Sequence, residues 1–479
     1  MTILRRPNSG LSSRRSVVEA GLAVGATGLL IACGEDAKPA AAPTAAAKPA
    51  EPSKAPAAAA PTTAPAAAAT KAPEPTKAPA VLKGATVRWL GGEWSFLPAL
   101  TEVLEAFGND WAKQNNVTIS FEKTTDILPR VQTVIETKGG ADIIQYSSPP
   151  ATIANGLADV SDIADFLGKE GGGYLPAAPF QQVVDGKWLG IPMGQHNWFV
   201  NYRQDYLKEE GLDTFPDTWD EALKVGTKLK AKGRPFGVCM SDQASGDGNA
   251  NSRLLLWAFG GKEFNPDGTL ALDSKETLAS LEFAIELHNK ANDPGGVGYN
   301  DASNNQGFLA GKLSMALNVN TIYLPALKNN PDIAAGMNHA LPPKGPAGRF
   351  GYGQLPFWGI FNHTKGADLD AAKDLIKQFF SMKNYGKFIQ TGQGYILPLL
   401  PAYEKEPVWP TDPKLGIAKE MFKTALPAGH ALKFQSRLSS LIQDRVILGK
   451  LYSRAASSGN AKQALADTMK EIDDLKKLS

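Results

Sequence analysis

A stretch of 45 residues near the N-terminus, Asp36 to Ala80, limits which part of this chain can fold. It contains 21 alanines and 10 prolines. Alanine favours helix, but a proline every few residues breaks each helical turn, and the stretch has too little apolar surface to offset the entropy lost on ordering. We therefore predict an extended tether over residues 33–80 and a folded body that begins near Val81.

The segment before the tether has the pattern of an export signal. Four arginines lie between residues 5 and 15, and 13 uncharged residues follow from Ala20 to Ala32. This run is shorter than the roughly 20 residues that a membrane-spanning helix needs, but it has the length of the apolar region of a signal peptide. Residues 1–32 are therefore predicted to be a signal peptide.

The end of this signal resembles a bacterial lipobox. In Leu30-Ile31-Ala32-Cys33, the resemblance implies that the cysteine is acylated and that the chain is cut just before it. Cys33 would then anchor the protein by lipid to the extracytoplasmic face of the cell membrane. An uncleaved anchor with an incidental cysteine is the alternative. Ser13-Arg14-Arg15 is similar to a twin-arginine signal, so the sequence leaves open this route and general secretion.

The body carries nearly balanced charge. Positions 1–80 hold nine basic and five acidic residues, which leaves the body 41 of the 50 basic and 43 of the 48 acidic residues. This balance gives no basic stripe for nucleic acid, so we expect no nucleic-acid partner. Cys239 is the body's only cysteine, which excludes a disulfide within it. A body of about 400 residues favours two lobes over a single core.

The first part of the body alternates between the patterns of strand and helix. Three segments have the apolar pattern of strands: 86–90, 117–121 and 141–145. Two segments between them repeat apolar residues at helical spacing: 100–111 and 128–135. This alternation predicts a mainly parallel sheet covered by helices. Because ligands of such sheets bind at the carboxyl ends of the strands, the pattern points to the loops at 91–94 and 146–148.

Later segments carry signals for helix starts and for the core. Thr218 to Glu221 has the spacing of a capping box, and Asp273 is predicted to cap the helix that runs through Leu287. Trp89 and Trp111 lie at core spacing and are predicted to be structural.

Five segments of the body together resemble family 1 extracellular solute-binding proteins, the maltose-binding-protein-like receptors of ABC importers. They are Gly190 to Pro192 with Phe199 to Asp205, Pro216 to Leu223, Phe308 to Ala316, Pro343 to Pro346, and Gly392 to Pro398. Their order and spacing hold across nearly the whole body. The chain departs from the family at Asn201-Tyr202, where Tyr-Asn is usual, and at 318–323, which lacks a tryptophan often used to stack on the ligand.

The resemblance implies an α/β fold of the two-lobe periplasmic-binding-protein type (type II). Each lobe would be a mixed sheet flanked by helices, with a hinge between the lobes. By analogy, lobe 1 covers about 82–193 and 350–401, and lobe 2 covers about 198–342 and 402–479. The resemblance also implies a ligand enclosed between the lobes and delivered to an ABC permease and its ATPase. No cofactor is implied, and we expect a monomer.

The family's ligands and the residues near loop ends favour a sugar. Sugars present apolar ring faces and many hydroxyls, which suit aromatic rings and amides. We predict ten ligand contacts: Glu93, Trp94, Tyr146, His196, Asn197, Asp242, Trp257, Asn320, Tyr352 and Gln354. A wider set of polar and aromatic residues adds Trp198, Gln243, Asn249, Asn251 and Trp358. Trp257 could equally belong to the core, and 242–251 could equally be a polar turn.

An enzyme is the competing class. The sequence has no H-E-x-x-H or G-x-S-x-G motif, and its five histidines lie far apart, so we predict no catalytic residue and no metal site. A carboxylate pair of a surface hydrolase stays open, because only geometry reveals it. Within the binding class, polyamine or metal capture is the alternative. A polyamine site needs several cleft carboxylates, for which Glu93 and Asp242 are candidates, whereas the adjacent tyrosines expected of an iron site are absent.

The predicted lipid anchor leads to a direct test. Cys33→Ser removes the thiol that would be acylated, so the protein should move from the membrane fraction to the soluble fraction. Fractionation followed by mass spectrometry of the mature N-terminus measures both effects. An unmodified Cys33 thiol, or a mature protein that retains residues 1–32, would contradict the prediction.

Overall fold

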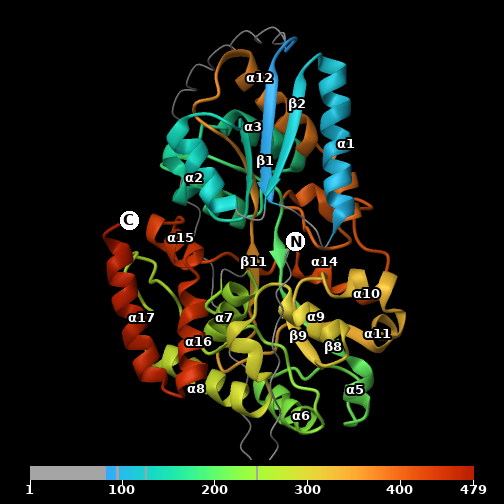
Figure 1. The fold of residues 1–479 in the computed structure, drawn as a ribbon, viewed down its shortest axis with the longest axis vertical. Coiled ribbons are helices and arrows are strands. Elements are labelled where there is room, and N and C mark those ends of the chain that lie inside the picture. The colour runs from blue at the N-terminus through green and yellow to red at the C-terminus, as the bar shows by residue number, and fades with distance from the viewer. Residues whose placement is uncertain (1–81, 93–96, 125–126, 244–245) are drawn as a thin grey trace, which may run out of the picture. The chain divides into compact units, whose positions relative to one another are not determined.

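The computed structural model describes residues 82–92, 97–124, 127–243 and 246–479, all within one compact unit of the chain, Pro75–Ser479 (Figure 1). The predicted signal peptide, the lipid-anchor residue Cys33, the tether, Glu93 and Trp94 lie outside the described residues. Within them, no helix has both the length and the apolar character needed to cross a membrane.

The first sheet has five strands in the order β2-β1-β3-β12-β6. They are β1 (Thr86–Gly92), β2 (Thr118–Thr124), β3 (Ile143–Tyr146), β6 (Ile191–Pro192) and β12 (Phe357–Ile360). β1 pairs in parallel with β2 and β3, and β12 pairs antiparallel with both β3 and β6. Four strands therefore run one way and β12 opposes them, which confirms the predicted mainly parallel sheet.

Helices cover both faces of this sheet because apolar side chains alternate along its strands. Trp89 and Ile143 pack with α1 (Pro98–Asn115), α3 (Ser161–Gly171) and α12 (Gly366–Phe380) on one face. Leu90 and Ile144 pack with α2 (Ile127–Thr137) on the other.

Both tryptophans predicted to be structural lie in this core. Trp89 is 3% exposed and packs edge-on against Trp358, with ring centroids 5.9 Å apart. Trp111 is 5% exposed, and its indole Nε1 donates to Asp374 Oδ2 at 2.8 Å, which satisfies the one polar atom of a buried ring. The structural role of both residues is confirmed.

The second sheet has three antiparallel strands in the order β10-β8-β9. They are β8 (Phe199–Arg203), β9 (Met315–Asn318) and β10 (Met337–Ala340). The longer helices in the same part of the fold are α6 (Trp219–Ala231), α7 (Gly246–Ala258), α8 (Lys275–Lys290), α16 (Ile447–Ser458) and α17 (Ala461–Lys476) (Figure 1). Helices α7, α8, α16 and α17 contribute to one apolar cluster, which buries Leu254, Leu281, Leu451 and Leu465.

A third sheet joins the other two. Its strands are β7 (His196–Asn197), β11 (Gly351–Gln354) and β13 (Ala425–Leu426), in the order β13-β11-β7. In the chain, β7 lies between β6 of the first sheet and β8 of the second, and β11 lies between β10 of the second and β12 of the first. The chain therefore crosses between the two larger sheets at least twice through strands of the third sheet. The predicted lobe boundaries stay a prediction.

The remaining elements are shorter. The strands are β4 (Val183–Val184) and β5 (Lys187–Trp188). The α-helices are α4 (Ala177–Gln182), α5 (Gln204–Lys208), α9 (Ser303–Leu309), α10 (Tyr323–Asn329), α11 (Pro331–Gly336), α13 (Tyr385–Thr391), α14 (Ile417–Met421) and α15 (Arg437–Asp444). The 3-10 helices are η1 (Pro150–Thr152), η2 (Ala154–Gly156), η3 (Pro294–Gly298), η4 (Pro401–Lys405) and η5 (Pro413–Leu415).

Two of the predicted helix starts can be compared with the structure. The Thr218 hydroxyl accepts a hydrogen bond from Glu221 N at 3.3 Å, which confirms the cap of α6. The predicted cap at Asp273 is wrong by one residue, because the hydroxyl of Ser274 accepts from Thr277 N at 3.1 Å and α8 begins at Lys275. Ser274 has the extended backbone of a capping residue, with φ −145° and ψ 161°.

The possible polar turn at 242–251 is wrong for residues 246–251, which form the first turns of α7. This segment is rich in Gly, Asn and Asp, which favour turns when they stand alone. Its first two amides are instead bound by a distant side chain, since Asp301 accepts from Gly246 N at 3.2 Å and from Asp247 N at 3.0 Å. The cap that allows the helix to start is therefore 54 residues away in the chain.

The corrected start of α8 can be tested with two neighbouring variants. Ser274→Ala removes the hydroxyl that binds the Thr277 amide, so we expect a loss of about 1 kcal/mol in the free energy of unfolding. Asp273→Ala changes an exposed neighbour without a capping role and should cost less than about 0.5 kcal/mol. Urea unfolding of both variants compares them, and a larger loss for Asp273→Ala would contradict this assignment.

Candidate functional site

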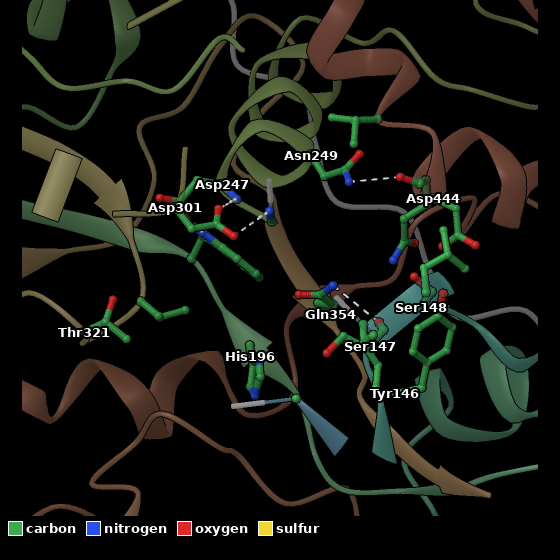
Figure 2. Close-up of a pocket in the computed structure, with 18 of the residues that line it drawn as sticks. Tyr146, Ser147, Ser148, His196, Asp247, Asn249, Asp301, Thr321, Gln354 and Asp444 are labelled. Atoms are coloured by element: carbon green, nitrogen blue, oxygen red, sulfur yellow. Dashed lines mark hydrogen bonds between the residues drawn. The ribbon is translucent and has the colours of Figure 1, made fainter. Parts of the chain in front are cut away.

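A cleft of about 670 Å³ opens where the strand ends of the first sheet face α7 and the second sheet (Figure 2). Its volume lies in the range of sites for small organic molecules, roughly 300–1,000 Å³. Three structural groups line it: the carboxyl ends of β1, β2 and β3, strands β7 and β11 of the third sheet, and a wall built from α7, β9 and the end of α15 with the turn that follows it. We call these the first wall, the floor and the second wall.

The first wall forms where three parallel strands end side by side. Gly92, Gln145 and Tyr146 line the cleft together with Ser147 and Ser148. The amide of Gly92 donates to Gln145 Oε1 at 3.1 Å and so ties the end of β1 to that of β3. The described parts of the loops at 91–94 and 146–148 therefore lie at the cleft, as the strand pattern predicted.

Tyr146 is the aromatic residue of the first wall. It is 4% exposed, and its ring meets Phe357 edge-on with centroids 6.3 Å apart. Burial, together with the nearby Asp444 carboxyl, raises the pKa of the Tyr146 phenol well above its usual value. The phenol is therefore neutral at physiological pH and can both donate and accept hydrogen bonds.

The floor comes from the third sheet. His196 of β7 lies opposite Gln354 of β11, and the Gln354 amide Nε2 donates to the carbonyl oxygen of Ser147 at 3.3 Å. The His196 ring packs on Tyr395, with centroids 4.3 Å apart. Burial lowers the pKa of His196 to about 3, so its imidazole is neutral. Its Nε2 atom is buried without a hydrogen-bond partner among the described residues, so the cleft floor holds one polar atom whose hydrogen bond is not satisfied there.

The second wall is organised by one buried carboxylate, Asp247, which is 3% exposed. It accepts three N–H bonds: from Trp198 Nε1 at 2.6 Å, from Asn304 Nδ2 at 2.9 Å and from Asn318 Nδ2 at 2.9 Å. Burial and the neighbouring Asp301 charge raise the pKa of Asp247 well above its usual value, while the bonds from Trp198 and Asn304 lower it. The carboxylate thus fixes three side chains that come from different elements.

Asn318 extends this arrangement along the cleft. Its Nδ2 also donates to Asn305 Oδ1 at 2.7 Å, and its Oδ1 accepts from the Thr321 hydroxyl at 3.2 Å. The same Oδ1 accepts from Val319 N at 2.7 Å. Asn305, Asn318, Val319 and Thr321 all line the cleft, so this part of the wall presents amides and a hydroxyl in fixed positions.

The end of α15 and the turn to α16 complete the second wall, with Gln443 and Asp444 from the helix and Val446 from the turn. Asn249 of α7 donates to the Gln443 carbonyl at 3.0 Å and holds the turn against the wall. Val446 has φ +53°, in the left-handed region that a β-branched residue rarely adopts. Such backbone costs about 1–3 kcal/mol and persists only where the surrounding structure fixes it, often at ligand sites.

Asp444 reaches toward the first wall, where it lies beside Ser148 (Figure 2). Burial raises the pKa of the Asp444 carboxyl to about 6, against the lowering effect of the Ser148 and Thr152 hydroxyls and of the Arg445 charge. Asp444 of α15 in the second wall therefore contacts Ser148 of the first wall.

The structure brings together three of the ten predicted ligand contacts: Tyr146, His196 and Gln354. Five others lie in the described part of the chain but do not line the cleft: Asn197, Asp242, Trp257, Asn320 and Tyr352. Glu93 and Trp94 are outside the described residues. Of the wider set, Trp198 and Asn249 line the cleft. Binding of a ligand by any of these residues stays a prediction.

Local contacts and exposure explain why these five residues do not line the cleft. Asn197 and Asn320 use their amides on backbone carbonyls, of Met421 at 3.1 Å and of Gln393 at 2.7 Å. Trp257 and Tyr352 are 1% exposed, and Trp257 Nε1 donates to Glu263 at 2.9 Å. Asp242 is exposed and accepts from its neighbour Gln243 at 3.2 Å.

Sequence reasoning missed the residues that shape the second wall. Asp247, Asp301, Asn305, Asn318 and Asp444 come from segments far apart in the chain, and none lies in a recognisable motif. Two signals were available: the polar stretch at 242–251, of which Asn249 was noted, and the segment 318–323, where the family resemblance places a ligand contact. No group of three His, Cys, Asp or Glu side chains in the described part of the fold could hold a metal ion.

Comparison with known proteins gives consistent results. Residues 102–417 match the family described as bacterial extracellular solute-binding protein. A binding protein of Brucella abortus strain 2308 is 23% identical over 313 residues, which cover 62% of this chain and 72% of that protein.

Two solved structures are similar over 82% of this chain. One is a maltose-bound MalE3 of T. maritima, with a TM-score of 0.70, 21% identity and 100% of its chain covered. The other is a sugar transporter of Arthrobacter chlorophenolicus A6 with bound laminaribiose, with a TM-score of 0.68, 17% identity and 99% covered. At these identities the likeness shows the fold, and it confirms the predicted two-lobe α/β fold class.

The role of Asp247 in the second wall can be measured directly. Asp247→Asn leaves one acceptor oxygen for three N–H donors, so at least one buried donor loses its partner. We expect a loss of about 1–3 kcal/mol in the free energy of unfolding. The matched control Asp242→Asn changes an exposed carboxylate and should cost less than about 0.5 kcal/mol. Equal effects of the two variants in chemical denaturation would rule out the organising role.

Proposed function

Because the chain belongs to the bacterial extracellular solute-binding protein family, we propose that it is an extracytoplasmic receptor that captures a sugar or short oligosaccharide. The solute binds in the cleft between the first and second walls and is delivered, chemically unchanged, to the permease of an ABC importer. The ATPase of that importer drives uptake, and the receptor acts as a monomer.

The chemistry of the cleft lining carries this proposal. Neutral groups that donate and accept hydrogen bonds come from Gln145, Ser147, Ser148, Asn249, Asn305, Asn318, Thr321, Gln354 and Gln443. Tyr146, Trp198 and Tyr395 add aromatic surface, and the Nε2 atom of His196 has no partner among the described residues. A polyol needs this combination, because each hydroxyl both donates and accepts while the sugar ring is apolar on its faces.

Known relatives support the choice of solute. The two solved structures of similar fold were determined with maltose and with laminaribiose, and both ligands are disaccharides. A cleft of about 670 Å³ is large enough for one or two sugar rings. The absence of a tryptophan at 318–323 is consistent with a cleft in which Tyr146, Trp198 or Tyr395 supplies the aromatic contact instead.

The N-terminal segment supplies the location in this proposal. A lipid on Cys33 would hold the receptor at the outer face of the cell membrane. The 33–80 tether, at about 3.1 Å per residue when extended, would let the body reach roughly 150 Å from that anchor. Such reach allows the receptor to collect solute and still meet a permease in the same membrane.

Calorimetry with a panel of mono- and disaccharides tests the function. We expect at least one sugar to bind with a Kd in the micromolar range or tighter, since this range is reached with about −8 kcal/mol of binding free energy. Chromatography of the bound sugar should recover it intact. Failure of every sugar to bind, or its conversion to a product, would overturn the proposal.

The floor residue His196 provides a site-specific test with that sugar. His196→Ala should raise the Kd at least tenfold, about 1.4 kcal/mol, because it removes the unpartnered polar atom of the cleft floor. Asp242→Ala, which changes a predicted contact outside the cleft, should leave the Kd within about twofold. Thermal unfolding of the unliganded variants controls for loss of fold. Equal affinities of the wild type and His196→Ala would exclude His196 as a ligand contact.

A further inference from the structure

The charged side chains that line the described part of the cleft are all acidic: Asp247, Asp301 and Asp444. No lysine or arginine lines it, and the stretches 93–96, 125–126 and 244–245 contain neither residue in their sequence. His196 adds no positive charge, because burial lowers its pKa to about 3. The lining therefore offers an acidic solute no side-chain cation.

The start of α7 is the feature of the cleft that would ordinarily attract an anion. A helix N-terminus carries free amides and partial positive charge. Here the Asp301 carboxylate accepts from Gly246 N at 3.2 Å and from Asp247 N at 3.0 Å (Figure 2). The chain's own carboxylate thus takes the place that a carboxylate or phosphate of a solute would occupy.

One oxygen of the Asp444 carboxylate is left without a hydrogen bond at the edge of the first wall. Its Oδ1 atom is buried and has no hydrogen-bond partner among the described residues, although the hydroxyls of Ser148 and Thr152 hydrogen-bond to the carboxyl group. Arg445 follows it in the chain, but this side chain is exposed and does not line the cleft. Asp444 is half-buried, and a carboxylate oxygen buried without a partner is costly. The positive charge of an ammonium group of a solute in the cleft would offset this cost.

We propose that the cleft selects its solute by charge, that it prefers a polyol carrying a positively charged amino group over neutral and acidic counterparts, and that Asp444 sets this preference. The inference rests on the proposed function, because it takes the cleft as the solute site. Tyr146 stays neutral beside Asp444, since burial and that carboxyl both raise the pKa of its phenol. The aromatic ring and the carboxylate then form one corner that suits the apolar and cationic parts of an amino sugar.

The charge of the cleft can be measured without knowing the solute. In a Cys33→Ser background, Ser147→Cys places a thiol at the first wall, while the remaining Cys239 is buried. Two methanethiosulfonate reagents of similar size, one with a quaternary ammonium group and one with a sulfonate, report the local potential by their reaction rates. At pH 8, where Asp444 is ionised, we expect the ratio of cationic to anionic rates to be at least tenfold higher than for an exposed Ser457→Cys thiol.

Matched variants assign the effect to Asp444. Adding Asp444→Asn should lower the rate ratio at the Ser147→Cys thiol at least threefold, and Asp444→Ser serves if the first variant does not fold. Asp242→Asn removes an exposed carboxylate outside the cleft and should leave the ratio unchanged. Equal ratios at the cleft and surface thiols, or a ratio insensitive to both Asp444 variants, would overturn the inference.

Calorimetry with matched sugars then separates this inference from the proposed function. The probes are glucose, glucosamine and glucuronate, the corresponding galactose set, and spermidine. Tighter binding of an amino sugar than of its neutral counterpart, reversed by Asp444→Asn, supports the inference. Equal or tighter binding of an acidic sugar overturns it and leaves the sugar receptor intact. If spermidine binds and no sugar does, the sugar proposal fails while the charge preference stands. If no probe binds, the proposed function fails for these sugars and the reagent ratios alone decide the inference.

Discussion

The buried carboxylate of Asp247 is the interaction on which the second wall of the cleft depends. Removing a carboxylate from water is costly unless hydrogen bonds replace its hydration. Trp198, Asn304 and Asn318 supply those bonds, and each comes from a different part of the fold. The need to satisfy one acidic group therefore brings α7, α9 and β9 into a fixed arrangement. The amides and the hydroxyl along this wall follow from it, because Asn318, which binds Asp247, also positions Asn305 and Thr321.

The third sheet couples this wall to the first. Strand β7 has only two residues, and its pairing with β11 places His196 beside Gln354 at the cleft floor. Short strands between larger bodies are places where a small change in backbone angles moves whole sheets. Asp444 and Ser148, which come from opposite walls, are in contact in this structure. A hinge at this sheet, as the family resemblance implies, stays a prediction, and so does binding of a ligand at the floor.

Sequence patterns predicted the helices and strands whose apolar residues repeat at regular spacing and pack against neighbouring elements. The mainly parallel sheet follows from apolar periodicity, and the position of the cleft follows from the ends of its strands. The patterns could not choose between Asp273 and Ser274, because both residue types cap helices and the backbone conformation decides. They also missed the start of α7, whose first amides are bound by Asp301. The second wall depends on such distant pairs, and a single sequence carries no signal for them.

Two of the predicted ligand contacts that do not line the cleft, Trp257 and Tyr352, share one physical cause. Arg253 and Glu263 form a buried ion pair with atoms 2.9 Å apart, and such a pair needs further hydrogen bonds to offset its desolvation. Trp257 donates to Glu263, and Arg253 donates to Asn249 Oδ1 at 3.0 Å and lies near the ring of Tyr352. Trp257 and Tyr352 therefore surround the pair in the core, although their residue types suit a sugar. Asn249 accepts from Arg253 and also lines the cleft. The buried ion pair therefore affects the cleft lining through the position of the Asn249 amide.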